Sequence, residues 1–410
     1  MDDKKNNAEN KAKVKVSFVM FHNDPKTYTG GPRVLANLLA LIDTSKIEPI
    51  IISNNEKSRM TKDIIALGFN PYIIPMGQIM SQGKLFDKGI LNKLKGALEC
   101  LIFNFKVFKI LRKEKVQVVW LRNVKILLFV GFSSKLLRIP VIWDIGMEKF
   151  SKGKGIMYYI HYTGFTIANK VIAEAKVVFD QVFNPNLLKR FQHKTGAIKS
   201  AIGQERINAI NKAMQNKEDK VYEKGITLLF VGTLIDRKNP MFLLEGIKKI
   251  KDDGYNNFTL NLVGAESVEP AYVDQLKNYV ADLGIADQVN FLGWREDIPD
   301  LMINHDVLVI TSKNEGVPYT IIEAMYARMP ILGANVGGIP EVIDHEYNGL
   351  IYQNGNLEDF KKKFLKIVNE EDLRENLSQN AFEYVAKNHV PEKWVKAQEE
   401  LFFSLIERRN

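Results

Sequence analysis

The sequence predicts an α/β protein with two domains, each a mainly parallel sheet covered by helices. Three observations lead to this fold class. The chain has 410 residues and 46% hydrophobic content, more than one compact core usually organises. Short apolar segments alternate with longer amphipathic ones, as repeated β-α units require. Charged and polar residues at 201–224 interrupt this alternation, which then starts again, so we predict a linker there.

The first domain is predicted to span residues 14–200, after a disordered polar tail at residues 1–13. Val14–Phe21 has the apolar pattern of a strand, a Gly30–Gly31 turn follows, and Arg33–Ile42 is amphipathic with helical spacing. This order is the start of a β-α wound domain. Further strands are predicted at Glu48–Ile52, Val116–Trp120, Val141–Asp144 and Lys170–Ala173.

The second domain is predicted to span residues 225–387 and to repeat this plan. An amphipathic segment, Pro391–Arg409, follows within residues 388–410, and its Trp394, Phe402 and Leu405 can pack against another surface. We predict that this last helix crosses back onto the first domain. The strands of the second domain are predicted at Ile226–Val231, Thr259–Val263, Val289–Leu292, Val307–Thr311 and Ile331–Ala334.

Composition predicts a cytoplasmic protein. The single cysteine, Cys100, excludes an intrachain disulfide framework, and the polar N-terminus lacks the apolar core of a signal peptide. The longest apolar stretches, such as Ile126–Phe132, are far shorter than the roughly 20 residues of a membrane-spanning helix.

Charge is divided unevenly along the chain. Residues 1–200 contain 33 Lys and Arg against 15 Asp and Glu, a net charge of +18, whereas the remainder has a net charge of −9. The basic half is a candidate for an anionic partner, either a phosphate-bearing acceptor or a membrane surface. The alternative is a solvated basic surface without a specific role.

Residues 84–115 interleave basic and large apolar side chains. A helix of this composition can lie on an anionic membrane. Alternatively, its apolar face packs in the core of the first domain and only the lysines contact water. The second reading suits Leu98–Leu111 in particular.

A glycine turn with two adjacent cations follows the first strand of the second domain. The segment from Gly232 and Thr233 through Arg237 and Lys238 leads into a helix expected near Pro240. Cations and free backbone N–H groups at such a turn form a phosphate site. The two cations could also be exposed loop charges, but this loop lies on the same predicted sheet edge as a second polar loop.

That second loop contains Glu315, and Glu323 follows it in the next predicted helix, Thr320–Arg328. Both acids follow the strand Val307–Thr311, at the edge where open α/β sheets bind ligands. Glu315 suits acceptance of hydrogen bonds from vicinal hydroxyls. Glu323 has the capping-box spacing relative to Thr320, so a structural role and a ligand role are both open.

These segments together resemble the retaining nucleotide-sugar glycosyltransferases of glycosyltransferase family 4, and the resemblance covers nearly the whole chain. The family has the GT-B architecture of two facing Rossmann-like domains. Its most specific part here is Glu315-Gly-Val-Pro with Glu323-Ala-Met, followed by Gly337-Gly338-Ile-Pro-Glu341. Weaker contributions come from Gly30–Gly31, the Gly232 turn, Leu262-Val-Gly264 and Phe291-Leu-Gly293-Trp-Arg.

The resemblance implies a role for each matching residue. Glu315 would hold the hydroxyls of the donor sugar, Glu323 the ribose hydroxyls, and Lys238 would neutralise the diphosphate leaving group. The diphosphate would also meet Gly30 and Gly31 from the first domain. The remaining implied donor contacts are Gly316, Val317 and Pro318 to the diphosphate and the backbone of Trp294 and Arg295 to the base.

The chain departs from the family pattern at two positions. Thr233 stands where relatives often have an arginine beside the lysine, and we hypothesise that Arg237 replaces it. Gly146 stands where many relatives place a histidine near the reacting sugar. Asp144 and Glu148 are polar candidates nearby on the acceptor side, although a satisfied strand-end carboxylate is the plainer interpretation of either.

The resemblance implies a retaining, metal-independent hexosyltransferase without a cofactor. It would move a sugar from a UDP- or GDP-sugar to a glycan or lipid-linked saccharide in cell-surface polysaccharide or glycoconjugate biosynthesis. Related enzymes commonly work at the inner membrane face, so the resemblance also implies peripheral attachment there. The six histidines are dispersed, and no metal site or nucleic-acid partner is expected. Two alternatives remain: a nucleotide-sugar epimerase or hydrolase on the same fold, and a non-catalytic sugar-nucleotide-binding partner subunit.

Overall fold

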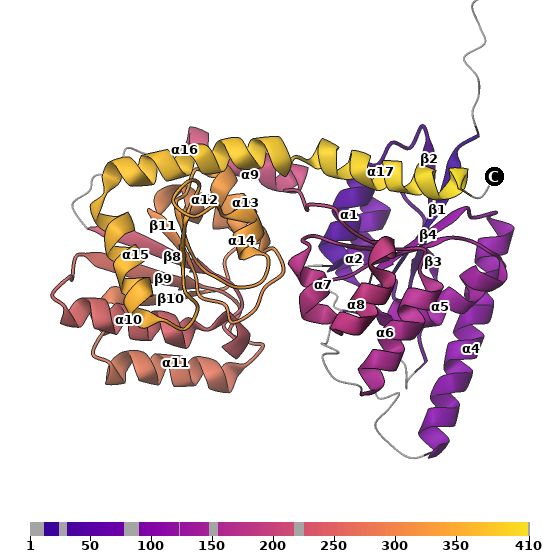
Figure 1. Ribbon diagram of the computed structural model, residues 1–410, viewed down its shortest axis with the longest axis horizontal. Helices are drawn as coiled ribbons and strands as arrows, with labels where there is room; N and C mark the ends of the chain where they lie inside the picture. The colour runs from indigo at the N-terminus through magenta and orange to yellow at the C-terminus, as the bar shows by residue number, and fades with distance from the viewer. Residues whose placement is uncertain are drawn as a thin grey trace, which may run out of the picture. The chain divides into compact units, whose positions relative to one another are not determined.

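The computed structural model describes residues 12–23, 31–77, 90–122, 124–146, 155–216 and 225–408 (Figure 1). The chain forms two compact units. The first comprises Met1–Ala173, Phe179–Ile198 and Val395–Asn410, and the second comprises Glu174–Val178 and Lys199–Trp394. Each unit is described here by itself.

The first unit is built on a parallel sheet of seven strands in the order β3-β2-β1-β4-β5-β6-β7. The chain therefore winds outward from β1 in one direction and then resumes at β4 on the other side of β1. Every residue of β4 and β5 is buried, as expected of a sheet covered on both faces. The strands are β1 (Val14–Met20), β2 (Ile47–Ser53), β3 (Tyr72–Ile73), β4 (Val118–Arg122), β5 (Val141–Asp144), β6 (Lys170–Ala173) and β7 (Thr195–Ala197).

The helices of the first unit bury apolar faces against this sheet and against each other. Helix α2 begins after Ser58, whose side-chain oxygen accepts a hydrogen bond from the Thr61 N–H, a standard N-cap. Helix α5 is apolar on most sides because it lies beside both α4 and α6. The helices are α1 (Gly31–Leu41), α2 (Arg59–Ala66), α4 (Ile90–Lys113), α5 (Val124–Leu136), α6 (Ile156–Ile167), α7 (Val177–Val182) and α8 (Pro185–Phe191), with the 3-10 turn η1 (Gln192–Lys194).

The second unit has a parallel sheet of six strands in the order β10-β9-β8-β11-β12-β13. The winding direction reverses between β8 and β11, so the loops after these two strands diverge at a topological switch point. Ligands of doubly wound sheets bind at this point. The strands are β8 (Ile226–Val231), β9 (Phe258–Val263), β10 (Val289–Gly293), β11 (Val307–Ile310), β12 (Ile331–Ala334) and β13 (Leu350–Tyr352).

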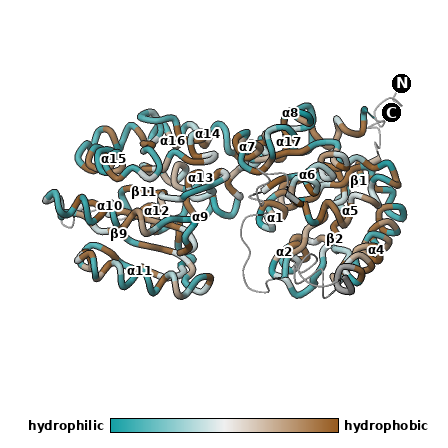
Figure 2. The backbone as a smooth tube through the Cα atoms, turned by 60° about the horizontal axis from the view of Figure 1, so that its bottom comes forward, coloured by the Kyte–Doolittle hydropathy of each residue, from teal (hydrophilic) through white to brown (hydrophobic). Residues whose placement is uncertain are grey.

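An aromatic cluster anchors helices of the second unit to the sheet. The Phe242 ring of α10 stacks on Tyr352 of β13 with centroids 5.7 Å apart, and Phe360 of α15 lies edge-on to Tyr352 at 5.1 Å. Figure 2 shows hydrophobic segments recurring along these helices. The helices are α9 (Gln204–Gln215), α10 (Pro240–Asp252), α11 (Pro270–Asp282), α12 (Ile298–Asn304), α13 (Tyr319–Tyr326), α14 (Ile339–Val342), α15 (Leu357–Asn369) and α16 (Glu371–Asn388), with the 3-10 turns η3 (Asp236–Lys238) and η4 (Ala286–Gln288).

The ten strands predicted from the sequence are all present, with ends that differ by at most two residues. Short β3, β7 and β13 were not predicted. The last helix, α17 (Pro391–Glu407), begins in the second unit and continues in the first, where the Phe402 ring lies edge-on to Phe18.

The predicted linker is partly helical. Within residues 201–224, α9 buries Ile207, Ile210 and Ala213 beside α12 and α13, so this stretch is part of the second unit. Residues 217–224 of the predicted linker and residues 1–11 of the predicted tail lie outside the described residues.

Candidate functional site

The candidate site lies where the loops after β8, β11 and β12 meet at the carboxyl edge of the second sheet. Backbone hydrogen bonds join these loops directly. The Lys313 N–H donates to the Arg237 carbonyl at 2.9 Å, and the Gly338 N–H donates to the Gly316 carbonyl at 2.9 Å. The edge is therefore a connected backbone surface, to which each strand contributes one loop.

The loop after β8 places its two cations at the start of a helix. Residues 236–238 form the turn η3, and Asn239 then adopts a left-handed conformation with φ 54°, which asparagine tolerates better than most residues. Pro240 follows as the first residue of α10, as predicted. The Thr311 hydroxyl donates to the Lys238 carbonyl at 3.1 Å, which fixes this turn to the end of β11.

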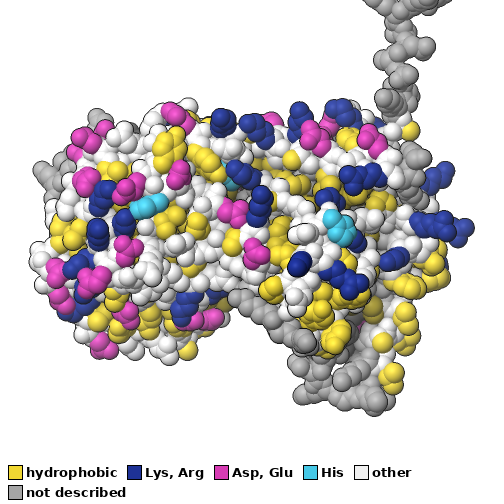
Figure 3. All heavy atoms as spheres, viewed as in Figure 1, with side chains coloured by type: hydrophobic (Ala, Val, Ile, Leu, Met, Phe, Trp, Pro, Cys, Tyr) yellow, Lys and Arg dark blue, Asp and Glu magenta, His cyan; other side chains and the backbone are white. Residues whose placement is uncertain are grey.

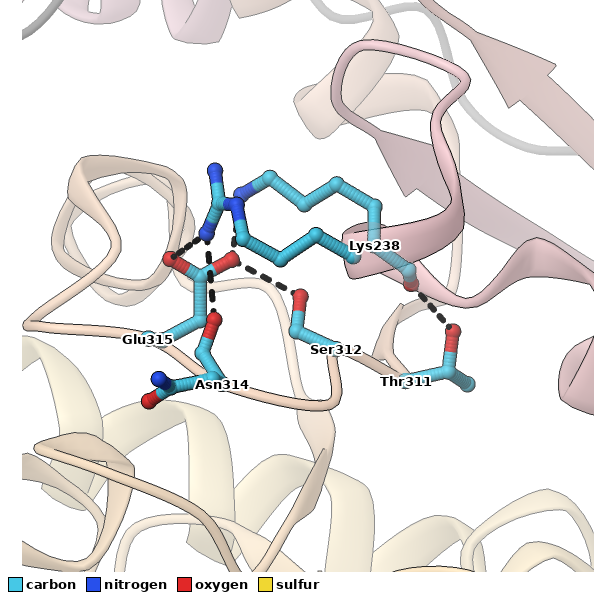
Figure 4. A network of polar contacts seen from close by, with 6 residues as sticks. Lys238, Thr311, Ser312, Asn314 and Glu315 are labelled. Carbon is cyan, nitrogen blue, oxygen red and sulfur yellow. Dashed lines mark hydrogen bonds and ion pairs between the residues drawn. The ribbon is translucent and has the colours of Figure 1, made fainter. Parts of the chain in front are cut away.

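Glu315 is the centre of a charged network (Figure 4). Its Oε1 accepts from the Lys238 ammonium and from the Ser312 hydroxyl at 2.8 Å, and its Oε2 accepts from Arg237 Nη1 at 3.2 Å. Arg237 also donates to the Asn314 carbonyl at 3.0 Å. The Glu315 side chain is only 7% exposed and that of Lys238 18%, so their charges interact in a poorly solvated setting.

The backbone after Glu315 closely approaches the loop after β12. A Cβ added at Gly338 would lie 2.5 Å from the Gly316 carbonyl oxygen, so only glycine allows this approach. Val317 is 6% exposed and Pro318 is buried, and Pro318 is the N-cap of α13 without a side-chain capping bond. The free N–H groups at the start of α13 carry the partial positive charge of a helix N-terminus, and no acidic side chain in the first turn neutralises it.

Glu323 does not form the capping box that its spacing suggested. Helix α13 begins at Tyr319, one residue before Thr320, so Glu323 lies beyond the third helical position where the box requires it. Instead its carboxylate accepts from Arg206 Nε at 3.1 Å, and the two side chains are 9% and 18% exposed. Arg206, which sequence reasoning missed, comes from α9 in the stretch predicted as a linker.

The predicted base contacts lie at the carboxyl end of β10. Trp294 is 61% exposed, so its ring is open to solvent. The Arg295 Nε donates to Asp297 Oδ1 at 2.7 Å, and this hydrogen bond lowers the pKa of Asp297 below its ordinary value. Thr233 lies two residues after the end of β8, beside the close approach of Gly264 to Gly232.

In the first unit, Asp144 is held by an ion pair. Its Oδ2 lies 3.3 Å from Arg122 Nη1, and both side chains are more than nine-tenths buried. Gly31, at the start of α1, and Gly146 both lie against the Arg122 side chain. This supports the interpretation of Asp144 as a satisfied strand-end carboxylate. Gly30 and Glu148 lie outside the described residues.

The described residues contain no group of three or more histidine, cysteine or acidic side chains that could hold a metal ion. None of the helices in the described part of the chain is long and apolar enough to cross a membrane.

Comparison with known proteins gives one family match. Residues 211–384, which include the network around Glu315, match the model of the family described as "Glycosyl transferases group 1". An uncharacterized glycosyltransferase of Methanocaldococcus jannaschii is 29% identical over 44% of this chain and 48% of its own, so the chain aligns with about half of that relative.

Two further similarities cover more of the chain. A relative from Escherichia coli named UDP-Gal:alpha-D-GlcNAc-diphosphoundecaprenol alpha-1,3-galactosyltransferase is 23% identical over 65% of this chain and 70% of its own. The crystal structure of a glycosyltransferase from Rickettsia africae superposes with a TM-score of 0.77 at 17% identity, over 96% of this chain and 99% of that one.

The fold is thus GT-B, with two Rossmann-like parallel sheets. The family match and the names of the relatives support a glycosyltransferase with this fold. The individual roles of Glu315, Lys238 and the other site residues stay predictions.

Proposed function

We propose that this protein is a retaining glycosyltransferase that moves a sugar from a nucleoside-diphosphate sugar to a glycan or lipid-linked saccharide. The observation that carries the proposal is the contact of the buried Glu315 carboxylate with Lys238 and Arg237 at the switch point between β8 and β11. Such a site offers cations to a diphosphate and a carboxylate to sugar hydroxyls within one network.

The proposed chemistry depends on the leaving group. Glycosyl transfer develops positive charge on the sugar and negative charge on the departing nucleoside diphosphate, and stabilising that negative charge is a large electrostatic contribution. Lys238 and Arg237 supply it, aided by the N–H groups at the start of α13. We assign no covalent nucleophile, because Glu315 is held by three donors and serves to orient the donor sugar. With two cations in place, we propose that no divalent metal is required, so EDTA should leave the rate unchanged.

The donor and acceptor classes are proposed from the relatives. The Escherichia coli relative is named for UDP-galactose and for an acceptor carried on diphosphoundecaprenol, and another relative is named for capsular polysaccharide biosynthesis in Staphylococcus aureus. We therefore propose a UDP- or GDP-hexose donor, a lipid-linked saccharide acceptor and a role in surface polysaccharide assembly at the cytoplasmic side of the membrane.

Turnover of the purified full chain tests this proposal. UDP- and GDP-hexoses are supplied with undecaprenyl-diphosphate saccharides, and the product's anomeric configuration is read by NMR. We expect acceptor-dependent release of nucleoside diphosphate with retained configuration. Glu315→Gln should remove at least about 99% of this activity, as loss of one transition-state contact does elsewhere. Asp282→Asn, at an exposed acid on α11, should remain active.

The alternatives give different results in the same assay. An epimerase or hydrolase would consume the donor equally well without acceptor. A non-catalytic binding subunit would bind nucleotide but turn over no donor, and Glu315→Gln would then change binding alone. An inverted product would contradict the retaining mechanism while leaving the donor site intact.

A further inference from the structure

Helix α4 of the first unit is apolar on two opposite faces. One face packs inward and buries Phe103, Val107 and Leu111. The interpretation of residues 98–111 as a core helix is therefore correct for this face only. The other face is exposed although it is apolar, whereas a surface helix ordinarily presents polar side chains there. Its residues and their exposed fractions are Leu94 (63%), Leu98 (57%), Leu101 (62%), Ile102 (49%) and Phe105 (57%).

These exposed residues form one continuous stripe. Leu94, Leu98, Leu101 and Phe105 are spaced by four, three and four residues, which places them above one another on a helix over about 16 Å. Figure 3 shows hydrophobic side chains gathered over α4. The neighbouring α5 adds two exposed apolar side chains, Phe132 and Leu136, each 64% exposed. We call these seven residues the α4 face.

Cations border the α4 face. The described part of α4 contains a single acid, Glu99, which is half-buried with its carboxyl group directed toward Gly77. The Lys109 ammonium lies 4.5 Å from the centre of the Phe105 ring, so its aliphatic stem covers part of the stripe. The exposed cations of the helix are Lys95, Lys106, Lys109, Arg112 and Lys113.

This charge pattern indicates which partner binds the α4 face. A second copy of the chain placed on the same face would bring five cations of one copy toward five of the other, and like charges disfavour such a contact. A partner with an apolar interior and an anionic outer layer can bury the apolar stripe and also contact the bordering cations. The interface of an anionic lipid bilayer has this structure, with acyl chains below a layer of negative headgroups.

We propose that the α4 face docks the protein on an anionic bilayer, with α4 parallel to the membrane surface. The leucines and Phe105 enter the boundary between headgroups and acyl chains, and the lysines contact the headgroups. This inference goes beyond the proposed function and does not depend on it, because it needs no donor and no turnover.

Vesicle flotation of the full chain tests the proposal. Vesicles of phosphatidylglycerol and phosphatidylcholine are compared with vesicles of phosphatidylcholine alone, at low and at high salt. We expect binding to the anionic vesicles that weakens as salt screens the headgroups. A triple variant, Leu98→Ser, Leu101→Ser and Phe105→Ser, should bind at least about tenfold more weakly, because apolar burial and charge act together.

A matched control separates the α4 face from exposed apolar residues in general. Ile65 and Leu67 on or beside α2 are 45% and 43% exposed, so Ile65→Ser with Leu67→Ser should bind vesicles like the unchanged chain. Circular dichroism and unchanged nucleotide binding establish that the triple variant is folded.

Three results would overturn the proposal: no flotation with anionic vesicles, equal binding to neutral ones, or full binding by the folded triple variant. A dimer that the triple variant loses, seen by light scattering, would assign the α4 face to a second copy instead.

Discussion

Replacing Glu315 with glutamine should affect the two parts of the proposed donor, the diphosphate and the sugar, in opposite directions. The substitution keeps the size of the side chain and the hydrogen bond from Ser312, but removes the charge that Lys238 and Arg237 contact. The Glu315 carboxylate accepts a hydrogen bond from the Lys238 ammonium. We expect a bound diphosphate to contact the same ammonium, so the carboxylate and the diphosphate compete for it. The variant should therefore bind a bare nucleoside diphosphate more tightly while it loses the contact with the donor sugar.

The magnitude follows from the burial of the pair. The substitution replaces a hydrogen bond between two charged groups with one between the charged Lys238 and a neutral amide oxygen. Hydrogen bonds to charged groups exceed neutral ones by roughly 1–1.5 kcal/mol, which is the upper limit for the weakened competition for Lys238. This corresponds to about five- to tenfold tighter binding of the diphosphate. The ion pair between Arg237 and Glu315 is left out of this magnitude, because the Arg237 side chain is 43% exposed and its charge is screened by water.

Isothermal titration of the nucleoside diphosphate and of the intact nucleotide sugar measures both effects, and kcat reports the sugar contact. We expect the diphosphate affinity to rise and kcat to fall by about a hundredfold or more. Loss of affinity for both ligands in a folded variant would contradict this prediction, because Glu315 would then maintain the loop rather than orient the sugar.

Three further variants test the roles of Gly338, Arg206 and His389. Gly338→Ala should weaken nucleotide binding at least about tenfold by displacing the neighbouring loop, whereas Gly196→Ala, where an added Cβ meets nothing within 4 Å, should not. Arg206→Gln should weaken a ribonucleotide about five- to tenfold but leave its 2′,3′-dideoxy analogue unaffected, because the arginine acts through Glu323 on the ribose hydroxyls; equal losses would contradict this. Burial lowers the pKa of His389 to about 4 from 6.5, so the unfolded chain binds the extra proton as pH falls. Stability against urea should decrease by about 2 kcal/mol from this group between pH 7 and pH 5, and His389→Gln should flatten that slope; an unchanged slope would contradict the assignment.

The fold could be predicted from the sequence because its strands are buried on both faces. Segments such as Leu228–Val231 and Val141–Trp143 are apolar without interruption, and this pattern remains visible without tertiary information. The short strand Tyr72–Ile73 escaped prediction because two residues cannot show a period.

The site was predictable where its residues lie on loops that follow predicted strands. The sequence places the Lys238 and Glu315 loops on one sheet edge, and in the structure the preceding strands, β8 and β11, are neighbours that end at that edge. Arg206 could not be found in this way, since it lies 117 residues from Glu323 in a stretch whose charged composition resembled a linker. The capping-box prediction failed because Pro318, not Thr320, is the N-cap of α13, so Glu323 is the fifth helical residue instead of the third.

The sequence alone could not predict which apolar face of α4 is exposed. Periodicity shows that Leu98 and Phe105 share a face, but two apolar faces on one helix look alike in sequence. Only the packing against α5 reveals which face is covered.

We propose that the switch point between β8 and β11 holds a nucleoside diphosphate through Lys238. Thermal unfolding with UDP, GDP and ADP tests it most directly, because a ligand that binds only the folded chain stabilises it by about 2.7 kcal/mol at a hundred times its Kd. We expect one nucleotide to raise the Tm, Lys238→Met to abolish this rise, and Asp282→Asn to preserve it. No rise with any nucleotide, or a full rise in a folded Lys238→Met variant, would contradict the claim.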